Sequence, residues 1–128
     1  MTRRPIEFAE FPAPIKPAYG PYAGIARHVV DGDTVDVLVS CGFGIYPYIT
    51  VRLLGIDAPE TNRAESKEAG IAARERLKEL LPPGEPVELW TRPDPDSFGR
   101  YLATIATEYE DDVGAVMLRE GFAVPYVR

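Results

Sequence analysis

Hydrophobic and β-branched residues gather in five short stretches that predict β-strands. These stretches cover residues 22–30, 35–40, 48–56, 86–92 and 100–107. In the second stretch Val35, Val37 and Val39 occupy every other position, which predicts a strand with one face in the core. The segment DGDT between the first two stretches contains Asp-Gly, a strong hairpin signal.

A different period appears between residues 66 and 81. Apolar residues recur there every three to four positions, at Ala69, Ala73, Leu77, Leu80 and Leu81. This spacing predicts an amphipathic helix. We expect Ser66 to be its N-cap, Gly70 to delay its start, and Pro82-Pro83-Gly84 to end it.

A shorter helix is predicted over residues 112–120, with Gly121 as its C-cap. The order of elements is then β-β-β-α-β-β-α. Three meandering strands, a helix and two more strands suit a small closed sheet with a helix plugging one end, which is the topology of the OB-fold. We therefore expect an α+β, mainly β fold: a five-stranded OB-fold barrel with two to three helices. An open α+β sandwich is the alternative.

The first 21 residues differ in composition from the rest of the chain. They hold five of its thirteen prolines, and proline restricts φ and lacks a backbone donor. This predicts an extended, proline-rich arm over residues 1–21 and one domain over residues 22–128, which is the domain count expected for 128 residues. The one cysteine, Cys41, excludes a disulfide within the chain and fits a reducing compartment.

Charge and hydropathy narrow the classes of function. No run reaches the length of about 18 apolar residues that suggests a membrane helix. The N-terminus lacks the apolar region of a signal peptide, so we expect a cytoplasmic monomer, or a secreted one if a leader has been removed. A net charge of −6 argues against a broad basic nucleic-acid surface. It leaves room for local positive charge or for a bound metal.

Three carboxylates stand at predicted strand ends: Asp33 in DGDT, and Asp57 and Glu60 in GIDAPE. If the first three strands form a meander, Asp33 and Asp57 converge at one end of the sheet. Two carboxylates, a carbonyl and waters suit a hard cation such as Ca²⁺. Each acid taken alone is also an ordinary turn or loop residue.

Two arginines add a possible phosphate site. Arg52 lies inside the apolar run ITVRLLGI, where a charge is costly unless it is paired or used. Arg100 follows Gly99 at the start of the fifth predicted strand. A guanidinium group can bind phosphate through two parallel hydrogen bonds. The alternatives are an outward-facing Arg52 and a strand-end charge at Arg100.

Three motifs, DGDTV, VRLLGIDAPE and DSFGRYLA, occur in this order with a helix between the last two. Together they closely resemble the staphylococcal nuclease (thermonuclease) family over residues 22–127. The resemblance implies an OB-fold nuclease, a phosphodiesterase that hydrolyses DNA and RNA with Ca²⁺ and gives 3′-phosphate products.

The resemblance also implies roles for the acidic segment. Asp33 and Asp57 match the family's metal carboxylates, and Ala58 matches a position that offers its backbone carbonyl. Glu60 matches the residue that positions or deprotonates the attacking water, and Asp31 matches a nearby acid outside the metal's direct ligands.

Arg52 and Arg100 match the family's two phosphate-binding arginines. Phe98 stands where the family often has a tyrosine, so that one hydroxyl contact to the nucleotide is missing. Tyr126 matches a tyrosine that flanks the nucleotide pocket.

Two readings compete with the nuclease. A non-catalytic OB module that binds single strands needs a positive groove and stacking aromatics. Candidate aromatics are present at Tyr46, Tyr48, Phe98 and Tyr126, but the negative net charge opposes this reading. A scaffold domain that uses the proline-rich arm as a tether is the third possibility.

Overall fold

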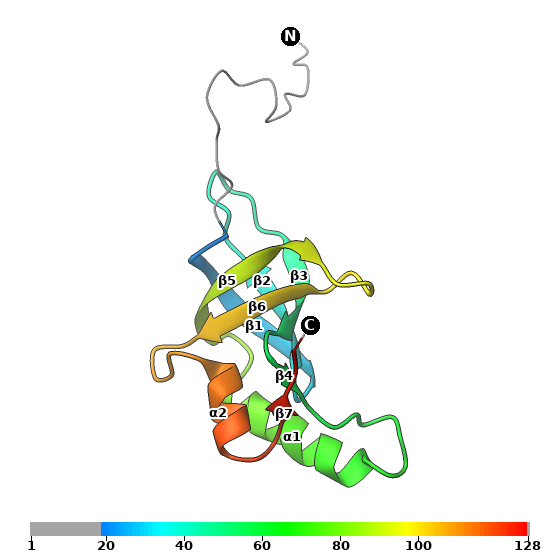
Figure 1. Cartoon of the computed structure of the whole chain (residues 1–128). Helices are drawn as coiled ribbons and strands as arrows, with labels where there is room; N and C mark the ends of the chain where they lie inside the picture. The colour runs from blue at the N-terminus through cyan, green and yellow to red at the C-terminus, as the bar shows by residue number, and fades with distance from the viewer. Residues whose placement is uncertain (1–18, 128) are drawn as a thin grey trace.

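Five strands close into a barrel in the computed structural model, which describes residues 19–127 (Figure 1). Most of the arm predicted over residues 1–21 lies outside the described residues. The barrel strands are β1 (Tyr22–Asp31), β2 (Thr34–Val39), β3 (Tyr48–Leu53), β5 (Pro86–Pro95) and β6 (Tyr101–Ala106). Their order around the barrel is β1-β2-β3-β6-β5, and only the β3–β6 pair is parallel. The predicted five-stranded OB-fold is confirmed, and the open sandwich is not.

The DGDT segment forms the hairpin turn expected of it. Asp31 at the end of β1 pairs with Thr34 at the start of β2, which leaves Gly32 and Asp33 at the tip. Side chains at alternate positions of β2 fill the barrel, as the period of two requires. They are Val35, Val37 and Val39, and all three are buried.

The third predicted strand is not continuous, and the prediction over residues 48–56 is wrong in this respect. β3 ends at Leu53, and Gly55 has a φ of 83°, a left-handed conformation that glycine adopts without steric cost. The chain turns there and leaves the barrel. It continues as β4 (Ile56–Asp57), which pairs with β7 (Val124–Pro125) in a separate two-stranded sheet.

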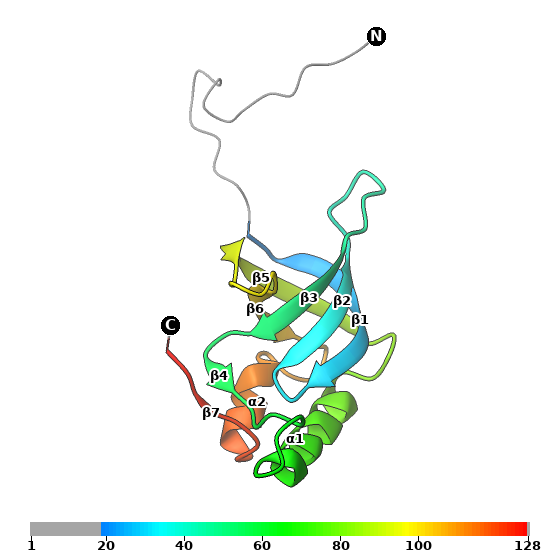
Figure 2. The same ribbon diagram turned by 90° about the vertical axis from the view of Figure 1, so that its right-hand side faces the viewer.

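Both helices lie under the end of the barrel where the β1–β2 hairpin turns (Figures 1 and 2). The loop between β2 and β3 projects from the opposite end (Figure 2). The helices are α1 (Lys67–Leu80) and α2 (Val113–Arg119). They are joined by an ion pair in which Arg76 Nε lies 2.6 Å from Glu120 Oε1. Among residues 19–127, neither helix combines the length and apolar character that crossing a membrane requires.

The ends of the helices confirm one prediction and correct two. Ser66 is at the N-cap position of α1, as predicted, but its hydroxyl makes no capping bond and donates instead to the Glu60 carbonyl at 2.7 Å. Gly70 does not delay α1, because it is buried within the helix. α2 ends at Arg119 with Glu120, not Gly121, as its C-cap, and Gly121 follows with a φ of 81° in the αL position of a Schellman motif.

The last barrel hairpin is longer than expected. β5 reaches Pro95 rather than residue 92, and its pairing with β6 is irregular between Thr91 and Pro95. Because proline cannot donate to a ladder, the sequence PDPDSFG suggested a loop throughout. The extension brings the beginning of this loop, at Asp96, directly against the start of β6.

Candidate active site

A polar hollow of about 120 Å³ opens at the hairpin end of the barrel. Its walls come from the β1–β2 turn, β3, the segment after β4, and the loop before β6. They include all six residues predicted for metal and phosphate chemistry, namely Asp33, Arg52, Asp57, Ala58, Glu60 and Arg100. The remaining lining residues are Asp31 and Pro59. The fold therefore brings together groups that are spread over about 70 positions of the chain.

Asp33 is nearly out of solvent, with 6% of its surface exposed. Its Oδ1 accepts a hydrogen bond from the Thr34 hydroxyl at 2.8 Å, and its Oδ2 accepts one from the Ala58 backbone N–H at 2.8 Å. The second bond ties the hairpin tip to the segment after β4. A buried carboxylate needs such partners, because burying an unpaired charge is costly.

Arg52 supplies the positive charge opposite these acids. Its side chain points into the hollow from β3 and is as buried as Asp33, so the alternative of an outward-facing arginine is excluded. One terminal nitrogen lies 2.9 Å from Asp33 Oδ2 and also donates to the Ile56 carbonyl at 2.9 Å. The other lies 2.9 Å from Asp57 Oδ1. The guanidinium group thus bridges the two predicted metal carboxylates.

Asp57 is the more accessible of the two acids, since half of its side chain is exposed. The donor set of Asp33, Asp57 and the Ala58 carbonyl consists of hard oxygen atoms, which fit a cation such as Ca²⁺. Within residues 19–127, no three His, Cys, Asp or Glu side chains are grouped to hold a metal. A cation here would therefore need waters or phosphate oxygens as further ligands.

Glu60 stands at the rim, where its carboxylate is paired with Arg63 at 2.9 Å. Both side chains are largely exposed, and an exposed pair of this kind contributes little free energy. The Glu60 backbone is better fixed than its side chain, because its carbonyl accepts the hydrogen bond from Ser66. Asp31 accepts a hydrogen bond from the Thr61 hydroxyl at 3.1 Å, which anchors the same loop to β1.

Arg100 is held by Asp96, a residue that the sequence reading did not single out. Asp96 Oδ2 lies 2.8 Å from both Nε and a terminal nitrogen of Arg100. Asp96 Oδ1 accepts the backbone N–H groups of Phe98 and Arg100, each at 2.9 Å. The available signal was an aspartate within the turn-rich segment PDPDSFG, because aspartate in a turn typically accepts the backbone N–H two residues on, as in an Asx-turn.

The Asp96 side chain is only 4% exposed. Burial alone would raise the pKa of this carboxyl, but the hydrogen bonds from the Arg100 and Phe98 N–H groups and the charge of Arg100 outweigh it and lower the pKa. Asp96 therefore stays ionised and keeps its hold on Arg100 into acid solution.

The two aromatic residues predicted at the nucleotide site do not line the hollow, but each lies against one of its arginines. The Phe98 ring centre is 5.2 Å from the Arg100 guanidinium carbon, and the Tyr126 ring centre is 5.9 Å from that of Arg52. These distances are within the range of cation–π contacts. Phe98 is largely exposed, whereas Tyr126 is fixed by its backbone N–H, which donates to Gly55.

Small residues let α1 press against both acid-bearing segments. A Cβ on Gly32 would lie 2.6 Å from the Ala73 Cβ and 2.9 Å from the Ala58 Cβ. A Cβ on Gly70 would lie 2.8 Å from the Glu60 carbonyl carbon and oxygen. The helix thus forms a close-packed base under the hairpin tip and the segment leading to Glu60.

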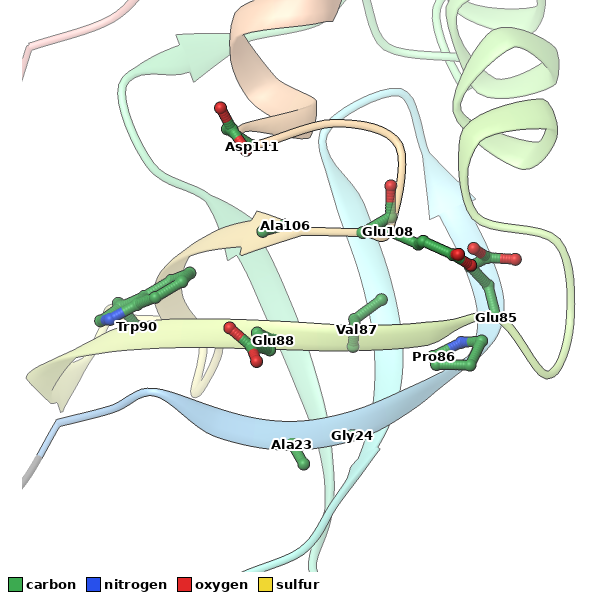
Figure 3. Close-up of a pocket in the computed structure, with 11 residues that line it drawn as sticks. Ala23, Gly24, Glu85, Pro86, Val87, Glu88, Trp90, Ala106, Glu108 and Asp111 are labelled. Atoms are coloured by element: carbon green, nitrogen blue, oxygen red, sulfur yellow. The ribbon is translucent and has the colours of Figure 1, made fainter.

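A larger hollow, of about 700 Å³, lies over β1 and β5 away from these residues (Figure 3). Its rim carries Glu85, Glu88, Glu108 and Asp111, with Trp90 at one end. None of the described residues that line it is basic, and like charges repel a phosphodiester. The larger hollow is therefore less suited to a phosphate ester than the smaller one, which is lined by two arginines.

Sequence comparison relates the chain to one protein family and to several known proteins. Residues 50–128 match the protein family described as "Staphylococcal nuclease homologue". The chain is 34% identical over 125 residues to "Endonuclease YhcR" of Bacillus subtilis (strain 168), covering 91% of this chain and 10% of that protein. It is 34% identical over 118 residues to "Micrococcal nuclease" of Shigella flexneri, covering 86% of this chain and 62% of that protein.

A third relative is "Protein ParB" of Escherichia coli, which is 31% identical over 123 residues that make up 86% of this chain and 60% of that protein. The chain thus spans about three fifths of two of these relatives and about a tenth of the other.

Proposed function

The chain belongs to the staphylococcal nuclease family, and from this premise we propose that it is a nuclease that hydrolyses phosphodiester bonds of DNA and RNA. One observation carries the proposal: two arginines, two candidate metal carboxylates and Glu60 line the same hollow. A hollow of about 120 Å³ is too small to enclose a nucleotide, but it can receive one phosphate group.

Arg52 and Arg100 bind the phosphate in this proposal. They enter the hollow from β3 and from the start of β6, two strands that pair directly through Arg52 and Leu102. Guanidinium groups on two sides can hold different phosphoryl oxygens. Such contacts accelerate the reaction when they strengthen as negative charge develops in the transition state.

Glu60 orients the attacking water and takes its proton. Its exposed position at the rim lets water reach it, and its weak pair with Arg63 is easily given up. The water oxygen forms a bond to phosphorus while the bond from phosphorus to the 5′ oxygen breaks, and the leaving 5′ oxygen takes a proton from solvent water. The products are a 3′-phosphate and a 5′-hydroxyl.

Asp33, Asp57 and the Ala58 carbonyl hold Ca²⁺ in this proposal, and that ion, when bound, offsets the phosphate charge and polarises a phosphoryl oxygen. The hard-oxygen chemistry of these donors supports the choice of Ca²⁺. Phe98 and Tyr126 flank the two arginines, where their rings contact the sugar and base of the bound nucleotide.

A cleavage assay tests this function. End-labelled DNA and RNA are incubated with the protein in Ca²⁺, in Mg²⁺ or in EDTA, and the phosphate position of each product is read from its mobility and its sensitivity to a 3′-phosphatase. We expect cleavage of both nucleic acids in Ca²⁺ alone and products with 3′-phosphates. A gel shift without cleavage would instead support a binding module. The absence of both cleavage and a gel shift would support a scaffold.

A further inference from the structure

Arg52 lies where a cation would have to compete with it. We propose that Arg52 is the resident counter-cation of the Asp33–Asp57 pair, and that its pairing with these acids and the binding of a divalent cation exclude one another. Cation binding then frees the Arg52 guanidinium for the phosphate. The inference rests on the proposed function, because it concerns the same cation site.

The hydrogen bonds of Asp33 show the competition. An ionised carboxylate can accept about four hydrogen bonds, and Asp33 accepts two, from the Thr34 hydroxyl and the Ala58 N–H. It also forms an ion pair with Arg52, which meets the same oxygen, Oδ2, as the Ala58 N–H. The Thr34 and Ala58 groups are neutral. The ion pair with Arg52 is therefore the contact that an incoming cation can replace with its own charge.

Charge in the hollow leads to the same conclusion. Four carboxylates and two guanidinium groups line it, which leaves two negative charges in excess. Arg52 is 2.9 Å from an oxygen of each candidate metal carboxylate and is almost fully buried. A positive charge at that distance in a poorly solvated site strongly opposes a second cation on the same oxygens. The pairing must weaken before the cation can bind fully.

Two further contacts keep Arg52 at the hollow when the acids release it. Its terminal nitrogen also donates to the Ile56 carbonyl, and its guanidinium carbon lies against the Tyr126 ring. Neither contact involves a candidate metal ligand. The released N–H groups therefore face the hollow rather than bulk solvent, and a phosphate is their natural partner. Without a cation, the Arg52 guanidinium is paired with Asp33 and Asp57 and cannot bind phosphate. Cation binding releases it.

Calcium titration by calorimetry tests the exclusion without relying on activity. The wild type is compared with Arg52→Gln, which removes the competing charge, and with Arg52→Lys, which keeps one charge but cannot span both acids. We expect Arg52→Gln to bind Ca²⁺ about tenfold more tightly than the wild type, in keeping with the loss of a like charge. Arg52→Lys is expected to fall between the two.

Arg63→Gln is the matched control. It removes one positive charge from the rim of the same hollow, but Arg63 pairs with Glu60 and not with Asp33 or Asp57. Its side chain is two-thirds exposed, so that solvent screens its charge. We expect its Ca²⁺ affinity to stay within about twofold of the wild type, as for a screened surface charge.

Thermal melting with and without Ca²⁺ covers the case in which Arg52→Gln is unstable. A ligand that binds only the folded protein raises its melting temperature more when affinity is higher. Ca²⁺ should therefore raise the melting temperature of Arg52→Gln more than that of the wild type.

Equal or weaker Ca²⁺ affinity in Arg52→Gln, with a normal wild type, overturns the inference and leaves the proposed nuclease intact. Failure of both proteins to bind Ca²⁺ overturns the inference together with the calcium part of the proposed function.

Discussion

Arg100 is oriented by one neighbouring carboxylate. Asp96 accepts hydrogen bonds from both the side chain and the backbone N–H of Arg100, and it is more buried than the arginine. A guanidinium group fixed in this way keeps its remaining N–H groups directed toward the hollow. In the proposed reaction Asp96 is therefore a positioning residue, because it would act on the phosphate through Arg100.

Replacing Asp96 with asparagine tests this role. Asp96→Asn keeps the size of the side chain but removes the charge, so Arg100 loses its fixed direction. We expect kcat to fall by roughly 10- to 100-fold, as small misplacements of catalytic groups do, with a smaller change in KM. Steady-state kinetics on a labelled oligonucleotide measure both constants. Asp111→Asn, at an exposed position outside the smaller hollow, is the control and should leave kcat unchanged. A fall in kcat that is fully explained by a loss of folded protein would contradict the positioning role.

The lowered pKa of Asp96 predicts how this loop responds to acid. A carboxyl whose pKa is lower in the folded protein contributes stability above its unfolded pKa and loses it as the pH falls through the folded value. The wild type should melt higher than Asp96→Asn at neutral pH. The difference should shrink only in acid below the ordinary aspartate range. Melting curves collected across pH measure it, and a constant difference down to strong acid would refute the assignment.

Glu60 offers a third test at the scale of single residues. Glu60→Gln keeps the shape of the side chain and removes its ability to accept the proton. We expect turnover to fall by about 10²-fold or more, as for the loss of a general base, while Ca²⁺ binding and the melting temperature are largely kept. Arg63→Gln, which removes only the exposed partner of Glu60, should stay near wild-type turnover. Undiminished cleavage by Glu60→Gln in saturating Ca²⁺ would remove Glu60 from the mechanism.

At the scale of elements, α1 acts as the base on which the acidic segments rest. Gly70 is the point of close approach, since a Cβ added there would lie 2.8 Å from the Glu60 carbonyl atoms and 2.9 Å from the Pro59 carbonyl oxygen. In an ordinary helix interior, alanine is more stable than glycine by about 1 kcal/mol. At Gly70 we expect alanine to be less stable than glycine, because the added Cβ would clash with backbone atoms that cannot rotate away as a side chain can.

Gly70→Ala should therefore destabilise the protein by about 1–3 kcal/mol, as overpacking does, and should also lower turnover by displacing Glu60. Urea unfolding and the cleavage rate measure the two effects. The control is Ala72→Gly on the exposed side of the same helix, where the ordinary preference for alanine should hold. A more stable Gly70→Ala variant would show that the segment at residues 59–60 adjusts freely.

Local chemistry explains which elements could be predicted from the sequence. The β1–β2 hairpin and both helices follow from turn residues and periodicity, which depend on neighbours in the chain. The break at Gly55 was visible as a glycine, but its turn off the barrel depends on the distant partner strand β7. Gly70 was interpreted as a helix-weakening residue because its contact with Glu60 is tertiary.

In the candidate site, too, the sequence indicated which residues take part but not their tertiary contacts. The family motifs indicated which residues gather at the hollow, and family membership is confirmed. Periodicity placed Arg52 on a strand but could not say which face it takes, because Val51 and Leu53 are buried as well as Arg52. Its partners only became visible in three dimensions. The proposed roles in catalysis remain predictions for the experiments above.

At the scale of the whole molecule, the charge distribution predicts how the proposed nucleic-acid substrate would bind. The chain is acidic overall, and the positive groups at the small hollow are two arginines. Binding through so few phosphate contacts should depend only weakly on salt. For two contacts on a single strand, the slope of log affinity against log salt is expected near about −1.4. Titration of an uncleavable oligonucleotide at several salt concentrations measures this slope, and a value several times steeper would reveal a broader basic surface.

The β4–β7 sheet also determines when the site is completed during synthesis of the chain. Asp57 pairs with Val124, a residue 67 positions further along the chain, and Gly55 accepts a hydrogen bond from Tyr126. A nascent chain that already carries all the acids and arginines of the small hollow still lacks β7, the strand that pairs with Asp57. Synthesis runs from the N-terminus, so the site is completed only when residues 124–126 have emerged. If the protein cleaves RNA as proposed, that order would delay cleavage of its own message and of the ribosome until translation has passed residue 126.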